Sequence, residues 1–308
     1  MEQTATRATL DPAWIAAQAQ VDWMAAPYMA EYVNGLVSGR SLADQGHWAL
    51  HALRQHIAPL AEKRGGSLSM LSLGCGNAHI ERALIEQFGW PIKRLVGYEY
   101  DSALREAAGV RFASLGIDSQ FEFFDFNAPP KPAQFDLLFC CHALHHATDV
   151  EAALAFAAEA IAPGGFFIGI EYLGPTRFQI EYDVLPHIRT LFSLLPAELR
   201  RNLSKGGLVE DQFEPPTLRD VREADPSESA RSSDLRTLLL SAFPIVELKP
   251  MGGTLLRWLL QYRAGNFRHD HPEHIAIARL LQAYEKNLIL SRQIRSDDLF
   301  FVLKGPAG

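Results

Sequence analysis

The chain has 308 residues, 48% of them hydrophobic and 21% charged, so it is long enough to bury a substantial core. Its formal charge of −7 excludes the broad basic surface that extended contacts with nucleic acid require. No apolar run of about 18 residues indicates a membrane span, and the first residues lack the pattern of a secretory signal. Three cysteines, two of them adjacent, do not form a disulfide framework. We therefore expect a cytoplasmic protein that binds neither nucleic acid nor membrane.

Residues 1–65 predict a helical extension that acts as a lid. Within it, the segment 47–63 repeats apolar side chains at helical spacing, as at Leu53 and Ile57. A glycine pair at 65–66 then marks the boundary to the next segment.

Residues 66–172 alternate short apolar runs with helical segments, which predicts βαβ units and a parallel sheet. The segment that starts at Thr148 has Glu151 at capping-box spacing and predicts one of the helices. The predicted strands cover residues 68–73, 94–100, 121–126, 135–141 and 164–172. The pattern is typical of a doubly wound α/β domain.

The alternation stops after residue 172, and residues 173–240 predict an insertion that caps the sheet and selects the acceptor molecule. Helical spacing in 180–195 indicates that this cap is helical. Residues 241–308 then supply a strand at 243–250, a helix near 272–290 and a final strand at 297–305. Together these segments predict a seven-stranded, mostly parallel sheet with a helical extension and a helical insertion.

The sequence LSLGCGNAHIE, residues 71–81, ends the first predicted strand with Gly74 and Gly76 and leads into a helix. Glycine permits unusual backbone angles and lets a ligand approach the main chain. A dinucleotide fingerprint needs a third glycine where His79 stands, which weakens the alternative of a nicotinamide-dependent oxidoreductase. The spacing of Gly74, Gly76 and Ala78 instead resembles that of class I S-adenosylmethionine-dependent methyltransferases.

The resemblance spans roughly residues 66–172 and rests on several motifs in the expected order. It implies S-adenosylmethionine as cofactor, with S-adenosylhomocysteine as product. It also implies that Glu99 accepts hydrogen bonds from the ribose hydroxyls and that Asp125 lies near the adenine amino group. The cofactor-binding residues that it implies are Gly74, Cys75, Gly76, Asn77, Glu99, Tyr100, Asp125, Phe126 and Cys141. Two positions depart from the family pattern, because Ser72 replaces a common acid and Ala78 replaces the third glycine.

The methyl-transfer reaction needs a base if its acceptor is a hydroxyl group. The resemblance implies that the fourth and fifth strands end beside the methionine portion of the cofactor. We therefore expect His146 to be the base, with His145, His142 and Glu171 as alternatives, since imidazole titrates near pH about 6.5. We expect no metal at these histidines, because neighbouring residues rarely converge on one ion without a distant fourth ligand.

Four polar residues near the insertion are candidates for binding the acceptor, namely Tyr172, Arg177, Gln179 and Arg231. The alternative for the arginines is that they pair with nearby acids. The segments EYLGPTRFQ and DPSESARSSD resemble bacterial methyltransferases of glycan and secondary-metabolite pathways. We therefore expect a small-molecule acceptor, and the sequence does not decide whether its methylated atom is oxygen or nitrogen. A protein that binds the cofactor without catalysis is a second alternative, and the sequence leaves the oligomeric state open.

Overall fold

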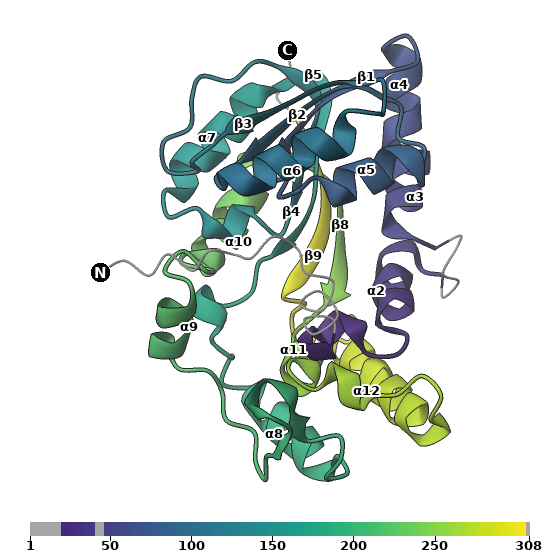
Figure 1. Ribbon diagram of the computed structural model, residues 1–308, viewed down its shortest axis with the longest axis vertical. Coiled ribbons are helices and arrows are strands. Elements are labelled where there is room, and N and C mark those ends of the chain that lie inside the picture. Colours follow the sequence, from purple (N-terminus) through teal and green to yellow (C-terminus); the bar gives the residue numbers. More distant parts are fainter. Residues whose placement is uncertain (1–19, 41–45, 306–308) are drawn as a thin grey trace. The chain divides into compact units, whose positions relative to one another are not determined.

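The computed structural model describes residues 20–40 and 46–305, and Figure 1 colours them along the chain. The parts of the predicted extension at 1–19 and 41–45 lie outside the described residues. The chain forms two compact units, each built from segments that are distant in sequence. The helical unit contains residues 20–33, 181–214 and 252–295, and the sheet unit contains the described residues of 34–180, 215–251 and 296–305.

Seven strands form one sheet in the order β3-β2-β1-β4-β5-β9-β8. The neighbours among the first five strands pair in parallel, and β9 runs antiparallel to β5. The strands are β1 (Leu68–Leu73), β2 (Ile92–Glu99), β3 (Asp118–Phe123), β4 (Phe135–Cys141), β5 (Ile161–Tyr172), β8 (Ile245–Gly252) and β9 (Asp298–Lys304). This arrangement confirms the predicted seven-stranded, mostly parallel α/β fold.

One face of the sheet is covered by α7 (Val150–Ala160) and α10 (Ser232–Ala242). Alternate strand residues such as Leu71 and Leu138 are buried in the same apolar cluster as Leu154 of α7 and Leu235 of α10. Successive side chains of a strand point to opposite faces, so their neighbours in sequence face the other layer.

The opposite face carries a second layer of helices, two of which, α5 and α6, lie across the sheet in Figure 1. Phe139 of β4 stacks on Trp48 with ring centroids 6.2 Å apart and meets Trp90 edge-on at 5.9 Å. Phe112 of α6 meets Phe121 of β3 at 5.4 Å. The helices of this layer are α3 (Trp48–Ala52), a π-helical turn (Leu53–Ile57), α4 (Ala58–Lys63), α5 (His79–Glu86) and α6 (Ser102–Phe112).

The helical unit has a buried carboxylate at its centre. Glu285 accepts hydrogen bonds from the Tyr32 hydroxyl at 2.7 Å and from the main-chain nitrogens of Leu255 at 2.7 Å and Leu256 at 3.0 Å. Its elements are α8 (Leu185–Leu194), β6 (Arg201–Asn202), β7 (Leu208–Val209), α11 (Leu256–Leu260) and α12 (Pro272–Leu290). The sequence predicted both α8 and α12. The chain also forms α2 (Met29–Ser38), which includes the unit boundary, and α9 (Leu218–Ala224) in the sheet unit.

The compact units do not follow the boundaries that the sequence suggested at residues 65, 172 and 240. The predicted insertion is divided, since residues 181–214 belong to the helical unit and its two flanks belong to the sheet unit. Through the described part of the chain, no helix is both long and apolar enough to cross a membrane.

Two local predictions in the sheet unit were wrong. Asp149, and not Thr148, caps α7, because its Oδ1 accepts a hydrogen bond from the Ala152 nitrogen at 2.9 Å. The Thr148 hydroxyl instead donates to Asn127 at 2.7 Å. Strand β3 ends at Phe123, so Asp125 lies in the turn that follows the strand.

Candidate functional site

The candidate site lies at the edge of the sheet where four parallel strands end. Leu73 pairs with Tyr98 of β2 and with Cys140 of β4, and Cys141 pairs with Ile170 of β5. The turns that follow β1, β2, β4 and β5 therefore meet at one edge, which is where open α/β sheets bind their ligands.

Gly74 and Gly76 shape the turn after β1, and both have left-handed backbone angles, with φ of 63° and 56°. A side chain at Gly74 would collide with the Cβ of Ala143, so this glycine allows the turns after β1 and β4 to touch. A Cβ at Gly76 would have no atom within 4 Å, so the main chain there is open to a ligand.

Glu99 links the glycine turn to the next helix. Its Oε2 accepts a hydrogen bond from the Gly76 nitrogen at 2.9 Å, and its Oε1 accepts one from the Asp101 nitrogen at 2.9 Å. Tyr100, the next residue, is 68% exposed, and its ring lies 5.4 Å from that of Phe123. The carboxylate keeps further lone pairs that could accept hydrogen bonds from a diol.

A second carboxylate, Glu81 of α5, lies on the other side of the strand end. The Ser72 hydroxyl donates to Glu81 Oε1 at 2.6 Å, and both side chains are buried. Glu81 Oε2 is buried and has no hydrogen-bond partner among the described residues. Burial raises the pKa of Glu81 to about 7 against the opposing hydrogen bond from Ser72. Ser72 stands where the family often has an acid, and Glu81 of α5 places a carboxylate next to that position.

Glu81 is not among the predicted site residues, although the sequence carries a signal for it. Glu81 precedes Leu84 by three residues, which places both side chains on the buried face of α5. A charged residue on an apolar helix face is rare unless the charge has a partner. Ala78, at the third glycine position, begins this helix with φ of 55°, a left-handed angle that costs an alanine about 1 kcal/mol or more.

The other residues implied to bind the cofactor surround the glycine turn or lie beyond β3. Asp125 Oδ1 accepts a hydrogen bond from the Asn127 nitrogen at 2.8 Å, and Phe126 is half-buried with its ring edge against Phe124. Asn77 Oδ1 accepts a hydrogen bond from the His79 nitrogen at 3.3 Å.

The two cysteines of the site are uncharged at neutral pH. Cys75 follows Gly74 in the turn after β1, and Cys141 ends β4. Burial raises the pKa of both thiols, and the carboxylate of Glu81 raises both further. They therefore act as small apolar groups beside the turn.

Glu171 and His145 form a buried pair at the ends of β4 and β5. Glu171 Oε2 accepts hydrogen bonds from the main-chain nitrogens of Ala143 at 3.0 Å and Leu144 at 2.7 Å, and its Oε1 contacts His145 Nδ1. His145 Nε2 lies 3.1 Å from Glu228 Oε1. Both imidazole nitrogens are thus held by carboxylates, and the pair fixes the turn after β4.

Each residue of this pair stabilises the charged form of the other. Burial favours the neutral forms of both groups, but mutual attraction and hydrogen bonding outweigh it. They lower the pKa of Glu171 to about 2 and raise the pKa of His145, which Glu228 also contacts, to about 10. Both nitrogens of His145 are held by carboxylates, and the fully buried Glu171 is held by main-chain nitrogens. This geometry counts against His145 and Glu171 as the base, and the directions of their pKa shifts agree with it.

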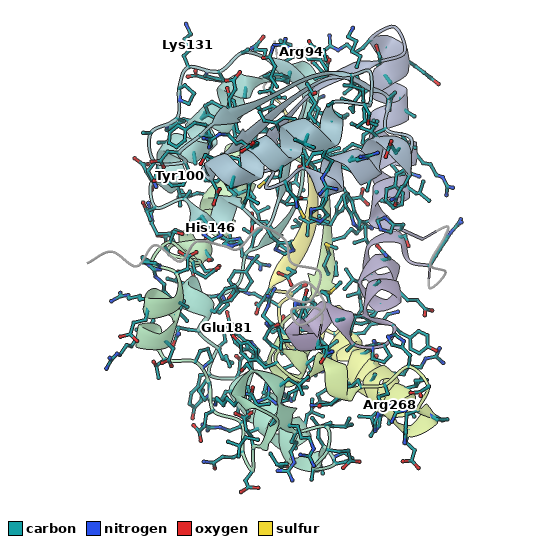
Figure 2. The ribbon with its side chains drawn as sticks, viewed as in Figure 1. Arg94, Tyr100, Lys131, His146, Glu181 and Arg268 are labelled. Carbon is teal, nitrogen blue, oxygen red and sulfur yellow. The ribbon has the colours of Figure 1, made fainter. Side chains whose placement is uncertain are left out.

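His146 has the opposite properties, and it is labelled in Figure 2. Its Nδ1 lies 2.9 Å from the Ser227 hydroxyl, which donates to Asp225 Oδ1 at 2.6 Å. Because the serine proton goes to Asp225, the imidazole must donate through Nδ1, which leaves the lone pair on Nε2. Burial and the charge of His145 lower the pKa of His146, so it is neutral near pH 7. Its side chain is 32% exposed.

His142, the remaining candidate base, is exposed and has a left-handed backbone angle with φ of 49°. Its main-chain nitrogen donates to the Ile170 oxygen at 2.8 Å, which ties the turn after β4 to β5. The four candidates for the base thus lie together, but they differ in protonation and accessibility, and His146 fits the role best.

The four residues expected to bind the acceptor are engaged within the sheet unit. The buried Tyr172 donates its hydroxyl to the Pro175 oxygen at 2.9 Å. Arg177 donates to the Pro226 oxygen at 2.6 Å, and Gln179 donates to the Arg177 oxygen at 3.0 Å.

Arg231 pairs with nearby acids, which was the alternative to acceptor binding for the arginines. Its guanidinium donates to both carboxylate oxygens of Glu151, at 2.7 and 2.9 Å, and to Asp234 at 2.9 Å. These contacts hold the flanks of the insertion to each other and to α7, and the assignment of Tyr172 and Arg231 to acceptor binding stays a prediction.

Residues 71–167 match the model of a methyltransferase domain family. This match covers the glycine turn and the ends of β1, β2 and β4, where the site lies. Over these residues the match agrees with the predicted resemblance to class I S-adenosylmethionine-dependent methyltransferases, a family whose cofactor is S-adenosylmethionine. A comparison with curated protein sequences finds no match.

Solved structures similar to this chain include three of different kinds. An S-adenosylmethionine-dependent methyltransferase from Mesorhizobium loti is 18% identical with a TM-score of 0.45, over 85% of this chain and 98% of that one. The [4+2]-cyclase SpnF is 15% identical with a TM-score of 0.42, over 84% and 83%. The phosphoethanolamine N-methyltransferase 2 of Haemonchus contortus, solved with S-adenosyl-L-methionine, is 14% identical with a TM-score of 0.44, over 97% and 61%.

Proposed function

We propose that the protein transfers a methyl group from S-adenosylmethionine to a hydroxyl group of a small molecule. The observation that carries this proposal is the pair of carboxylates beside one open glycine turn. Glu99 is bonded to Gly76, and Glu81 is buried behind Ser72 with one unpartnered oxygen. A cofactor with a ribose diol, an ammonium and a sulfonium group matches these acceptors in hydrogen bonding and in charge.

In this proposal, Gly76 gives the cofactor access to the main chain and Glu99 accepts hydrogen bonds from the ribose. Asp125 and Phe126 hold the adenine ring. Glu81 accepts a hydrogen bond from the ammonium group of the methionine portion. A buried carboxyl oxygen without a partner costs about 1 to 3 kcal/mol, and an ammonium group would remove that cost.

Binding of S-adenosylhomocysteine tests the role of Glu81. Since burial holds the pKa of Glu81 at about 7, an arriving ammonium group displaces a proton from the carboxyl near that pH. Calorimetry at pH 6.5 in two buffers of different ionisation enthalpy should therefore detect proton release. Glu81→Gln should abolish the release and weaken binding by about 10-fold to 100-fold.

Two controls make this test specific. Methylthioadenosine, which lacks the amino-acid portion, should bind Glu81→Gln and the wild type alike. Glu86→Gln changes an exposed glutamate of the same helix that pairs with Arg82, and it should leave both ligands unaffected. Equal losses for both ligands in Glu81→Gln would place Glu81 outside the ammonium site.

When bound, the cofactor would supply an electrophilic methyl group to the acceptor oxygen and would leave as S-adenosylhomocysteine. His146 takes the hydroxyl proton at Nε2, and Ser227 and Asp225 hold the imidazole in the tautomer that leaves this nitrogen free of hydrogen. Glu171 and His145 fix the turn that carries His146. The rest of the rate comes from positioning.

The acceptor class proposed here is a glycan-related or secondary metabolite, supported by the resemblance of the segments around residues 171–179 and 225–234. The test is mass-spectrometric detection of a methyl gain across a panel of hydroxyl-bearing metabolites, with matched amines. Methylation of amines alone would overturn the hydroxyl assignment. Binding of S-adenosylhomocysteine without any turnover across the panel would favour a non-catalytic cofactor-binding protein.

A further inference from the structure

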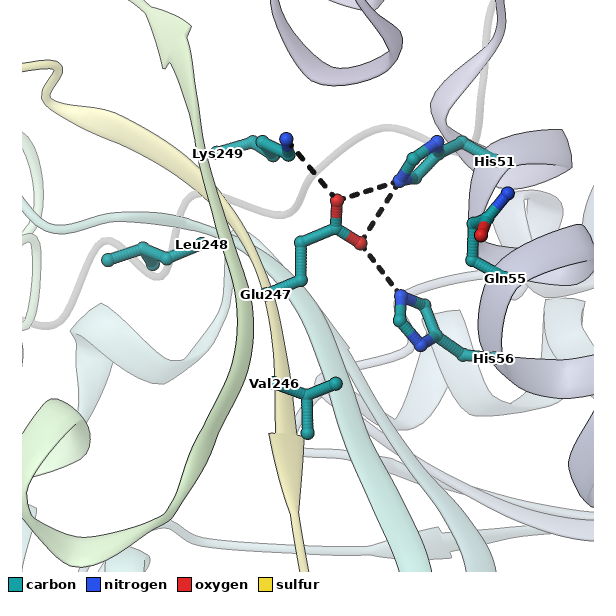
Figure 3. A pocket seen from close by; sticks show the side chains of 7 residues that line it. All are labelled: His51, Gln55, His56, Val246, Glu247, Leu248 and Lys249. Carbon is teal, nitrogen blue, oxygen red and sulfur yellow. Dashed lines mark hydrogen bonds and ion pairs between the residues drawn. The ribbon is translucent and has the colours of Figure 1, made fainter.

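A second group of histidines and a carboxylate lies in the sheet unit, distant from the glycine turn. His51 of α3, His56 of the π-helical turn and Glu247 of β8 converge, and Figure 3 shows their side chains directed toward one another. His51 Nε2 lies 2.8 Å from Glu247 Oε1, and His56 Nε2 lies 2.7 Å from Glu247 Oε2. One ligand atom from each of the three residues lies within 4.8 Å of the other two.

We propose that His51, His56 and Glu247 bind a divalent transition-metal ion, with Zn²⁺ as the best fit. Two imidazole nitrogens and a carboxylate oxygen are ligands that Zn²⁺ prefers, at bond lengths of about 2.0 to 2.2 Å. Tetrahedral ligands at such bond lengths lie roughly 3.4 Å apart, so the observed separations need only small movements. The three residues leave the fourth position to water.

The local backbone brings the two histidines together. Residues five apart on an α-helix point in directions that differ by about 140°, since each residue turns the chain by about 100°. The π-helical turn Leu53–Ile57 interrupts that period between His51 and His56. Such turns are rare and occur frequently at functional sites. Here the turn places both imidazoles on one carboxylate.

Neighbouring aromatic rings orient the two imidazoles. His51 meets the ring of Phe300 edge-on at 6.2 Å, and His56 meets Phe166 edge-on at 5.9 Å. Phe166 lies five residues before Glu171 on β5, which places the two about 16 Å apart along the strand and on opposite faces of the sheet. The proposed metal is therefore separate from the methyl-transfer site, and it would fasten β8 to the helices that precede β1.

The site is half-buried and can be reached from solvent. The side chains of His51, His56 and Glu247 are 19%, 12% and 14% exposed, and they line a cavity of about 440 Å³. Lys249 Nζ lies 3.6 Å from Glu247 Oε1 and competes with a metal ion for the carboxylate. Its side chain is 40% exposed and long enough to turn into solvent when the ion binds.

Titration of the chelator-treated, full-length protein with Zn²⁺ tests the proposal. Calorimetry should show one tight equivalent, and Co²⁺ should give the visible absorption of a tetrahedral or five-coordinate site. His51→Ala, His56→Ala and Glu247→Gln should each weaken Zn²⁺ binding by about 100-fold or more, beyond the effect of changing an outer-shell partner. Glu247→Gln keeps the shape of the side chain, so a folded variant remains available.

Two controls distinguish this site from others. Gln55→Ala alters the same cavity without removing a ligand and should leave the affinity unchanged. His146→Ala alters a second group of potential ligands, formed with His145 and Glu228, and should also leave it unchanged. No Zn²⁺ binding by the wild type, or binding that is undiminished in His51→Ala and His56→Ala, would overturn the proposal.

Discussion

The sheet unit contains two groups in which glutamate meets histidine, and they differ in what surrounds the carboxylate. Glu171 is fully buried and accepts hydrogen bonds from main-chain nitrogens as well as from His145. Glu247 is bound by the side chains of His51, His56 and Lys249 and lines a cavity.

The difference shows that the main chain decides what such a group can do. Main-chain donors cannot leave Glu171 without breaking the turn after β4, so this carboxylate keeps its charge and serves the structure. The partners of Glu247 are side chains, and these can move so that a metal ion binds the carboxylate in their place. The same pair of residue types thus serves as a fixed support at the end of β5 and as an adaptable ligand set between β8 and the helices that precede β1.

The largest expected effect concerns the base that the Glu171 group positions. His146→Ala should lower the rate of methyl transfer by about 100-fold to 10,000-fold while leaving affinity for S-adenosylhomocysteine nearly unchanged, because the imidazole acts only on the acceptor proton. Single-turnover measurements with an identified acceptor check this. His51→Ala, in the other group, should keep the normal rate. A normal rate in His146→Ala would exclude it as the base.

The next effect is on stability and compares the two carboxylates directly. Glu171→Gln should lower the free energy of unfolding by about 3 to 5 kcal/mol, since it leaves a buried imidazolium without its main partner. Glu247→Gln, measured with a chelator present, should cost less than about 1 kcal/mol because its partners reach solvent. Urea denaturation at pH 6 gives both values. Similar losses of unfolding free energy in the two variants would show that the two carboxylates contribute alike to stability.

The smallest effect is the pH dependence of the Glu171 contribution. The pKa of Glu171 is lowered from 4.5 to about 2, so its stabilisation is present above pH 4.5 and lost as the pH falls. The pKa of His145 is raised from 6.5 to about 10, so its stabilisation is complete below pH 6.5 and lost as the pH rises. The difference in unfolding free energy between wild type and Glu171→Gln should therefore peak between pH 4.5 and 6.5.

Measured by urea denaturation, that difference should shrink by about 1 to 3 kcal/mol between pH 6 and pH 9. The corresponding difference for Glu247→Gln is the matched comparison. A constant difference for Glu171→Gln across this range would show that the pair is not charged in the folded protein.

The fold could be predicted from the sequence because the strands are apolar runs between turn residues. The bounds of β1 and β4 agree with the predicted strands at 68–73 and 135–141. The glycine turn was also predictable, because a backbone that must adopt left-handed angles restricts the residue type. The position of Glu99 was implied by the family resemblance alone. The division into units was not, since the helical unit assembles three distant segments.

The candidate site was only partly predictable, because its decisive contacts join residues whose spacing carries no signal. Ser72 and Glu81 meet through the packing of α5 on β1. The choice of His146 over His145 required the orientation of the short helical turn at 144–146. Neighbouring residues of such a turn point in very different directions, so their spacing in the sequence does not show which one faces the site. Glu247 and His51 are 196 residues apart in sequence. The π-helical turn also removes the helical spacing by which the histidine pair could have been recognised.

The position of β9 has a consequence for how the protein is made. This strand is synthesised after the other six strands of the sheet, yet it pairs with β5 and separates it from β8. While the ribosome is still adding residues 173–297, the paired edge of β5 lacks its neighbour and can attract strands of other chains. A premature stop before residue 298 would leave the cofactor turn intact but the sheet open, so the cell would receive an aggregation-prone fragment.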